Sequence, residues 1–250
     1  MKGFLVLFKK ELREQAKTHR LLIVLAVFLV LGMGTPLMLY YLPSIVNTSE
    51  GTQLPIPDFT AADVSMEFLG SIAQIGMVVV ILVAMGAVSR ERERGTALLT
   101  LSKPVGRGTF VVAKLAALAV TFEISLIVSA LFCYIYVGVL FDGVGGAAFA
   151  AATALAGLFL LLCISITLLC SSIFKSAFAA GGAALVVIVV LWALSAIPNI
   201  GSYAPMGVLD WGNGLILGKG TGAWGSLCIS AGLAVAFIVG AWQALMRKEI

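Results

Sequence analysis

The chain has 250 residues, of which 61% are hydrophobic and 11% are charged, and its formal net charge is +4. Its mean hydropathy is +1.10, which means more apolar surface than a water-soluble domain can bury. Several apolar runs are longer than the roughly 18 residues that mark a membrane-spanning helix. A transmembrane β-barrel would show alternating segments of about ten residues, which the sequence lacks. We therefore expect an all-α membrane protein.

Residues 1–20 are expected to form an amphipathic helix ahead of the first span. Phe4, Phe8 and Leu12 fall on one side of this helix, and lysines and arginines fall on the other. A basic helix with an apolar stripe lies in the headgroup plane of a membrane. The alternative is a soluble tail, which the phenylalanine and leucine content disfavours.

Six apolar segments follow, each long enough to cross the bilayer, and together they define one six-span domain over residues 21–250. The spans are expected at residues 21–42, 68–88, 115–140, 147–173, 177–197 and 223–246. Long connections separate some of them, at 43–67, 89–114 and 198–222. Thr60 and Asp63, in the first connection, have the spacing of a capping box that would begin the helix of the second span.

The basic residues predict the orientation of the spans. With six spans, every lysine and arginine except Lys219 falls on the side that holds the N-terminus. Cytoplasmic loops carry an excess of lysine and arginine. Both termini and the loop 89–114 are therefore expected in the cytoplasm, and 43–67 and 198–222 are expected to be outer loops.

The loop 89–114 is the one densely charged interruption of the apolar chain. An arginine in hydrocarbon costs roughly 2.5 to 3.5 kcal/mol, so this loop must lie in water or against a partner. Within it, Thr96 can cap a short helix that Pro104 ends, with Leu98 and Leu101 on one face. Such a helix suits a groove on a soluble protein. A solvated loop that only satisfies the charge bias is the alternative.

Few residues could serve an enzyme. The single histidine, His19, is expected at the membrane surface, which excludes a Ser/His dyad within the membrane. The four cysteines fall inside predicted spans and are expected to be small buried hydrophobes. The run 212–221 imitates a phosphate-binding loop, but its spacing is wrong and Gly220 replaces the required Ser or Thr, so we expect a flexible turn. No catalytic residue, metal site, directly bound cofactor or nucleic-acid partner is expected.

Glu123 is the one ionisable residue that lies well inside a predicted span. A carboxyl group at that depth is either a functional group in a transport path or a hydrogen-bonded link to a neighbouring helix, and the sequence leaves both open. Thr121, Ser125 and Ser129 repeat on a different face of the same helix. The third span is therefore expected to contact protein on more than one side.

The charged loop resembles a known family. Glu-Arg-Glu-Arg-Gly-Thr at 91–96, a leucine-rich turn, and Leu-Ser-Lys-Pro-Val-Gly-Arg at 101–107 are similar to the segment between the second and third spans of ATP-binding-cassette permeases of the drug and polysaccharide export class. The ending is most similar to the copper-enzyme-maturation branch, typified by the permease of nitrous oxide reductase assembly. Many relatives carry an acidic residue in the turn, where this chain has Leu98 or Leu99.

The resemblance implies a permease subunit of an exporter in the cell membrane, without ATPase motifs of its own. Its partners would be a second copy or a paralogue, two separate cytoplasmic ATPase subunits that hold ATP and Mg, and an outer accessory protein. A coupling helix at 97–101 would convert ATP hydrolysis into alternating access. The residues implied in this coupling are Glu91, Arg92, Glu93, Arg94, Gly95, Thr96, Leu98, Leu101, Pro104 and Arg107.

Two other functions stay open on the sequence alone. One is a stand-alone secondary transporter or channel that uses Glu123 as its coupling group. The other is a membrane anchor that transmits force or recruits other proteins.

Overall fold

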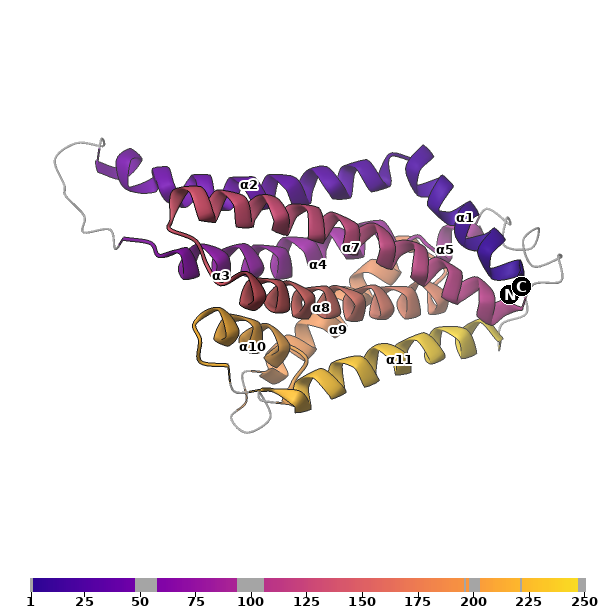
Figure 1. Cartoon of the computed structure of the whole chain (residues 1–250). Helices are drawn as coiled ribbons and strands as arrows, with labels where there is room; N and C mark the ends of the chain where they lie inside the picture. Colours follow the sequence, from indigo (N-terminus) through magenta and orange to yellow (C-terminus); the bar gives the residue numbers. More distant parts are fainter. Residues whose placement is uncertain are drawn as a thin grey trace.

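The computed structural model describes residues 2–47, 58–93, 106–195, 197, 203–220 and 222–246. Within these ranges the regular elements are helices and none is a strand (Figure 1). Six helical segments of the described chain are long and apolar enough to cross a membrane. The prediction of an all-α protein with six spans is confirmed.

The described elements follow the chain in a simple order. They are α1 (Lys2–Lys17), α2 (Arg20–Asn47), α3 (Ala61–Ser71), η1 (Ile72–Gly76), α4 (Met77–Ala84), α5 (Ser89–Glu93), α7 (Arg107–Leu140), α8 (Gly146–Ile173), α9 (Ala177–Ser195), α10 (Gly207–Ile216) and α11 (Trp224–Met246). The second span is built from α3, the π-helical η1 and α4, and it leads into α5.

Local sequence signals explain where several helices begin and end. His19 adopts a φ of +56°, which ends α1 and turns the chain into α2, because a right-handed helix requires negative φ. The predicted capping box is present: the Asp63 N–H donates to Thr60 Oγ1, and the Thr60 N–H donates to Asp63 Oδ2. It begins α3 at Ala61, earlier than the expected start of the second span at residue 68.

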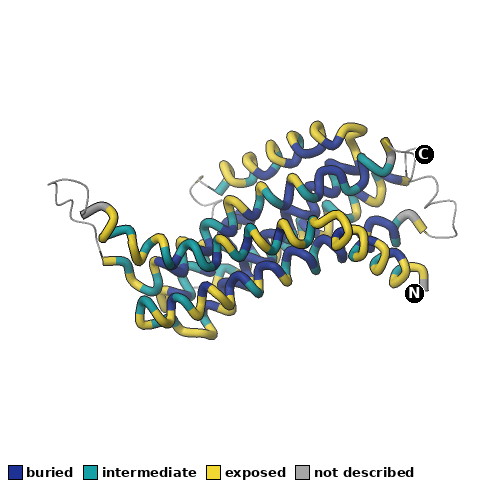
Figure 2. Tube along the Cα trace, turned by 90° about the horizontal axis from the view of Figure 1, so that it is seen from above, coloured by how far each residue is buried: buried dark blue, intermediate teal, exposed yellow. Residues whose placement is uncertain are grey.

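α8 lies at the centre of the bundle. Its most apolar stretch is 78% buried, against 22% for the corresponding stretches of α2 and α11 at the edges. It packs against α4, α7, α9, α10 and α11. Figure 2 shows that exposed positions follow the outer faces of the helices. Many of these are large and apolar, among them Val30, Val139 and Phe178, as expected for a surface that faces lipid.

The two ends of the bundle hold different elements (Figure 1). α1, α5, the start of α7 and the end of α11 gather at one end. We call it the loop end, because it holds the two segments that flank the charged loop, α5 and the start of α7, which we call the stems of the loop. α10 and the turn between α7 and α8 lie toward the opposite end. Asp142 and Gly143 make that turn with φ values of +62° and +82°, which suits Gly and Asp.

The structure corrects the first half of the flexible turn predicted at residues 212–221, while Leu217 and Gly218 do form a turn. The last turns of α10 begin this run, and Val208, Gly212 and Ile216 are buried. Their spacing of four places them on one face of the helix. A side chain at Gly212 would meet Ala152 of α8 at 3.4 Å. Gly212 therefore permits close packing of α10 on α8 and does not mark a turn.

Candidate functional site

A buried group of charged side chains joins α1 to both stems of the charged loop. Lys114 of α7 is 3% exposed. Its Nζ donates to both carboxylate oxygens of Glu11 at 3.0 Å and to Oε1 of Glu91 at 2.8 Å. Glu11 belongs to α1 and Glu91 to α5. We call Glu11, Glu91 and Lys114 the ionic junction, because it ties these three segments together.

The surroundings of Lys114 compensate the cost of burying its charge. Two carboxylates accept its hydrogen bonds, and the Phe110 ring lies 4.9 Å below the ammonium group, close enough for a cation–π contact. Lys10 approaches Glu11 and Glu91 at 3.7 Å from the surface side. Removing one partner of a buried ion pair costs roughly 3 to 5 kcal/mol. The junction therefore holds the loop stems and α1 in one arrangement.

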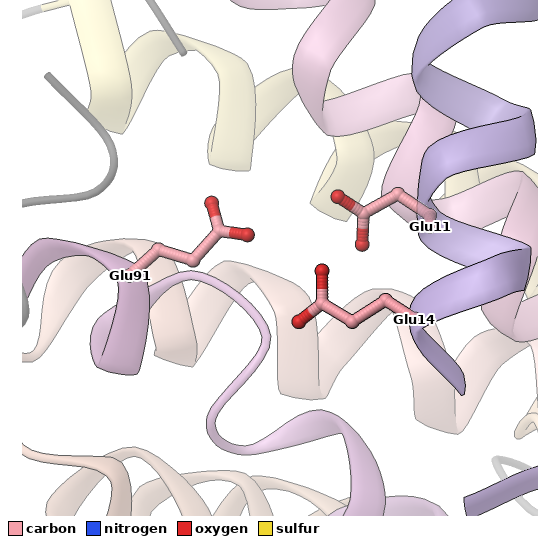
Figure 3. Close-up of side chains that lie close together, drawn as sticks. All are labelled: Glu11, Glu14 and Glu91. Carbon is pink, nitrogen blue, oxygen red and sulfur yellow. The ribbon is translucent and has the colours of Figure 1, made fainter. Parts of the chain in front are cut away.

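Figure 3 shows the carboxylates of Glu11, Glu14 and Glu91 facing one another from α1 and α5. One oxygen from each lies within 4.8 Å of the others, a grouping that hard divalent cations prefer. In this protein, however, lysine ammonium groups already lie next to the three carboxylates. Lys114 bonds Glu11 and Glu91, and Lys10 lies 4.0 Å from Glu14. We therefore interpret the cluster as an ion-pair network.

The face of α1 that meets the bundle combines one apolar and two polar side chains. Leu7, Glu11 and Gln15 are buried, while Phe4, Phe8 and Leu12 of the predicted apolar stripe are half-buried at its flanks. The two polar side chains are one helical turn apart, so they meet the same neighbour. That neighbour is α7, which receives Glu11 through Lys114 and Gln15 through Thr121.

Thr121 and Ser125 lie on the face of α7 that points to α1 and α2. The Thr121 hydroxyl donates to Gln15 Oε1 and lies 3.0 Å from the Ala117 carbonyl. The Ser125 hydroxyl donates to the Thr121 carbonyl at 2.8 Å. One turn further, Ser129 donates to the Phe28 carbonyl of α2. Through Thr121 and Ser129, this face of α7 is thus bonded to both α1 and α2.

Ser171 of α8 fixes the stem that enters the charged loop. Its hydroxyl oxygen accepts hydrogen bonds from the N–H groups of Val88 and Ser89 at 3.1 Å and donates to the Met85 carbonyl at 2.8 Å. These groups lie between α4 and α5, where helical hydrogen bonding is interrupted. The central helix therefore holds the corner from which α5 leaves.

The predicted coupling residues are only partly described. Glu91 belongs to the ionic junction, and Glu93 is exposed at the end of α5. The residues Arg94, Gly95, Thr96, Leu98, Leu101 and Pro104, and the side chains of Arg92 and Arg107, lie outside the described part of the chain. Sequence reasoning did not identify Glu11, Gln15 or Ser171. The spacing of Glu11 and Gln15 on one helix was the only available signal.

Glu123 lies apart from the junction, on the face of α7 that meets α8. A side chain at Gly157 of α8 would place its Cβ 2.5 Å from Glu123 Oε2, so the glycine makes room for the carboxylate. Glu123 Oε1 is buried and has no hydrogen-bond partner among the described residues. The predicted alternative of a hydrogen-bonded link is therefore not seen for this oxygen. The carboxylate borders a groove of about 470 Å³ between α7 and α8.

A second, smaller cavity of about 170 Å³ lies between the second span and α10. Gln74 from the π-helical η1 and Asp210 and Asn213 from α10 contribute its polar lining. Asn213 Oδ1 is buried without a hydrogen-bond partner in the described ranges. π-Helical turns often occur at functional positions, and this one was not predicted from the sequence.

Comparisons with known proteins identify relatives of the chain. The sequence model of a family described as ABC-2 family transporter protein matches residues 5–206. An uncharacterized transmembrane protein, YxlG of Bacillus subtilis (strain 168), is 28% identical over 210 residues, which cover 82% of this chain and 81% of the relative. The family match includes most of α1, the ionic junction, the whole charged loop and Glu123.

Proposed function

This chain belongs to the ABC-2 transporter family, whose members are membrane subunits of ATP-binding-cassette transporters, and we propose that it is the permease of an exporter driven by separate ATPase subunits. The proposal assigns the ATPase contact to the loop 89–114. ATP and Mg would be held by the ATPase subunits. The chain is a multi-pass membrane protein, and we place it in the cell membrane with the loop end in the cytoplasm.

The observation that carries the proposal is the ionic junction. An ATPase that pushes on the loop can do work only if the loop's stems are rigidly connected to the spans. Lys114 ties the outgoing stem α7 to Glu91 on the incoming stem and to Glu11 on α1. A displacement of the loop would therefore move α1, α5 and α7 together.

The arrangement of α7 supports transmission across the bilayer. It is one continuous helix of 34 residues, about 51 Å long at 1.5 Å per residue, whereas the hydrocarbon core is about 30 Å thick. α7 therefore extends beyond the bilayer, and its loop end carries Lys114. Movement at the loop end would reach Glu123 through the same rigid rod and shift α7 relative to α8.

Cytoplasmic placement of the loop end draws support from the sequence and from the fold. The loop end gathers α1, α5, the start of α7 and the end of α11 (Figure 1), and every basic residue of the chain except Lys175 and Lys219 lies in these segments or within a few residues of them along the sequence. The positive-inside tendency favours the cytoplasm for this end. Both termini would then lie inside the cell.

The finer assignments extend the family membership. We propose that a second copy or a paralogue completes the transport path, since six spans with few internal polar groups suit a path between two chains. An outer accessory protein belongs to the same proposal. The assignment to the copper-enzyme-maturation branch is supported only by the residues of the loop, Ser-Lys-Pro-Val-Gly-Arg at 102–107.

Co-expression with the ATPase encoded next to this chain tests the proposed function. We expect the two proteins to co-purify and to hydrolyse ATP in detergent. Leu98→Asp combined with Leu101→Asp should abolish co-purification, because two charges would enter an apolar contact. Leu217→Asp is the matched control, since Leu217 is exposed at the end of α10, away from the loop end, and it should leave co-purification unchanged.

Two results would contradict this proposal. If the double variant still co-purifies with the ATPase, the docking surface lies elsewhere. If the purified chain transports cargo in vesicles without any ATPase, it is a stand-alone transporter. The position of Glu123 at the groove is the observation that favours this second function. A membrane anchor would show neither transport nor coupled ATP hydrolysis.

A further inference from the structure

The groove between α7 and α8 is apolar along its walls and acidic at one end. α7 contributes Ile127, Ala130 and Leu131, and α8 contributes Phe149, Ala150 and Ala154. Glu123 lies at the end nearer the loop end, and Tyr134 lies toward the other end. Eleven positions separate these two residues on α7, which is about 16 Å of helix. The groove therefore extends along α7 and has a single charged group in its lining.

The groove is open toward the periphery of the bundle. Ile127 and Leu131 on its α7 wall are 61% and 57% exposed, and the outer faces of the helices are the lipid-facing surface. Its volume of about 470 Å³ falls within the roughly 300 to 1,000 Å³ typical of small-molecule sites. A molecule dissolved in the bilayer could therefore enter the groove sideways.

The carboxylate of Glu123 needs either a proton or a positively charged partner in this setting. A charge in a medium of low polarity is strongly unfavourable unless it is neutralised or paired. No lysine or arginine of the described chain forms an ion pair with Glu123. Lys114, the nearest basic residue along α7, is fully engaged by Glu11 and Glu91.

The side of α8 next to the carboxylate is kept free of side-chain atoms. Gly157 lies against Glu123, and any Cβ there would overlap Oε2 at 2.5 Å. Ala154, one turn before it on α8, is also small and exposed. Glu123 itself lines the groove, so a compact hydrogen-bond donor in the groove can approach its carboxylate, whose buried Oε1 lacks a partner among the described residues.

We propose that this groove binds amphiphilic ammonium ions that partition into the bilayer, with the ammonium group on Glu123 and the apolar tail along the walls of α7 and α8. An ammonium group supplies both the charge and the hydrogen-bond donors that the carboxylate lacks. The apolar walls bury the tail. This inference rests on the proposed function, because it makes the groove the entry site for the exporter's cargo.

Direct binding of a simple probe tests the site. The full chain in phosphatidylcholine nanodiscs is titrated with radiolabelled dodecylamine, and binding above that of empty nanodiscs is measured. We expect saturable binding that Glu123→Gln weakens at least tenfold, because the charge-assisted hydrogen bond is lost. Dodecanol, which has a similar tail but no charge, should bind weakly to both proteins with no difference between them.

Two pairs of variants locate the probe independently of Glu123. Ala154→Trp fills the groove and should abolish saturable binding, whereas Ala151→Trp, at an exposed position outside the groove lining, should not. Gly157→Ala should displace the carboxylate and weaken binding severalfold. Gly138→Ala on α7, where a side chain would meet nothing within 4 Å, should bind like the parent protein.

Three outcomes would overturn the inference. Unchanged dodecylamine binding by Glu123→Gln or by Ala154→Trp would show that the ligand lies elsewhere. Equal weakening of dodecanol and dodecylamine would indicate a general lipid site without recognition of charge. A change of oligomeric state in Ala154→Trp, measured by mass photometry, would mean that a second copy covers the groove. Each assay uses the permease alone, so its failure leaves ATPase co-purification as a separate test of the proposed function.

Discussion

The two faces of α7 differ in whether their polar and charged side chains have partners within the protein. On the face toward α1 and α2, Lys114, Thr121 and Ser129 all have partners on a neighbouring helix. On the face toward α8, Glu123 borders a groove and its Oε1 has no hydrogen-bond partner within the described chain. Both faces place ionisable groups in or near the membrane, yet only the first neutralises its charge internally.

This difference indicates that one face of α7 stabilises the fold and the other face is available for binding. A buried charge that the protein itself compensates fixes the arrangement of the elements around it. A carboxylate left without a partner costs stability and is retained where it can meet a ligand or a proton. The face toward α1 and α2 therefore serves as a mechanical connection, and the face toward α8 is the one where binding chemistry is expected.

We expect the largest loss of stability from a substitution of Lys114, on the face of α7 toward α1 and α2, which we call the compensated face because its charges are paired within the protein. Lys114→Met removes the ammonium group and leaves the negative carboxylates of buried Glu11 and half-buried Glu91 facing each other, so we expect a loss of roughly 3 to 5 kcal/mol in unfolding free energy. Thermal unfolding of the purified protein in detergent measures it. Lys175→Met, at an exposed position, is the control and should unfold like the parent. Equal stability of the two variants would show that the ionic junction does not stabilise the fold.

A smaller loss should result from separating α7 and α2. A side chain at Gly32 would clash with the backbone oxygen of Ser129, and backbone cannot move aside as a flexible side chain can. Gly32→Ala should therefore destabilise the protein by about 1 to 3 kcal/mol. Gly34→Ala meets nothing within 4 Å and should be neutral or slightly stabilising, because alanine favours helix over glycine. Similar unfolding temperatures for both would contradict close packing on this face.

Removing one neutral hydrogen bond from the compensated face should cost less still. Thr121→Val keeps the shape of the side chain but takes the donor from Gln15, a buried side chain of α1. We expect a loss of about 1 kcal/mol. Ser125→Ala removes a hydroxyl that bonds only within its own helix, and its unfolding temperature should change less. The reverse order would show that Gln15 is satisfied without Thr121.

The smallest effect on stability is expected on the face of α7 toward α8, where no described residue pairs with Glu123. Glu123→Gln removes a charge that no described residue pairs with, so the unfolding free energy should change by less than about 0.5 kcal/mol or rise. The same unfolding assay compares it directly with Lys114→Met. A loss as large as that of Lys114→Met would mean that Glu123 is compensated in the folded protein, and the contrast between the two faces would disappear.

Sequence reasoning found the features that depend on local pattern. The six spans follow from apolar runs, and the start of α3 follows from Thr60 and Asp63, because hydropathy and capping act within a few residues. The ionic junction escaped it because Glu11 and Lys114 are 103 positions apart. The glycine-rich run in α10 was misjudged because glycine has the same signature in a turn and in close packing. The groove depends on side-chain volumes across α7 and α8, which no single stretch of sequence specifies.

The π-helical turn η1 has a consequence for how the second span could vary. Such a turn accommodates one residue more than an α-helix of the same length. Deleting one residue between Ile72 and Gly76 would restore regular α-helical winding, and α3 and α4 would keep their present orientation, because the turn absorbs the extra residue locally. Val64 and Phe68, which are fully buried, would therefore stay in the interior. A single codon could thus be lost at this point without rotating either half of the span, whereas the same loss inside α3 or α4 would turn one half by about 100° relative to the other.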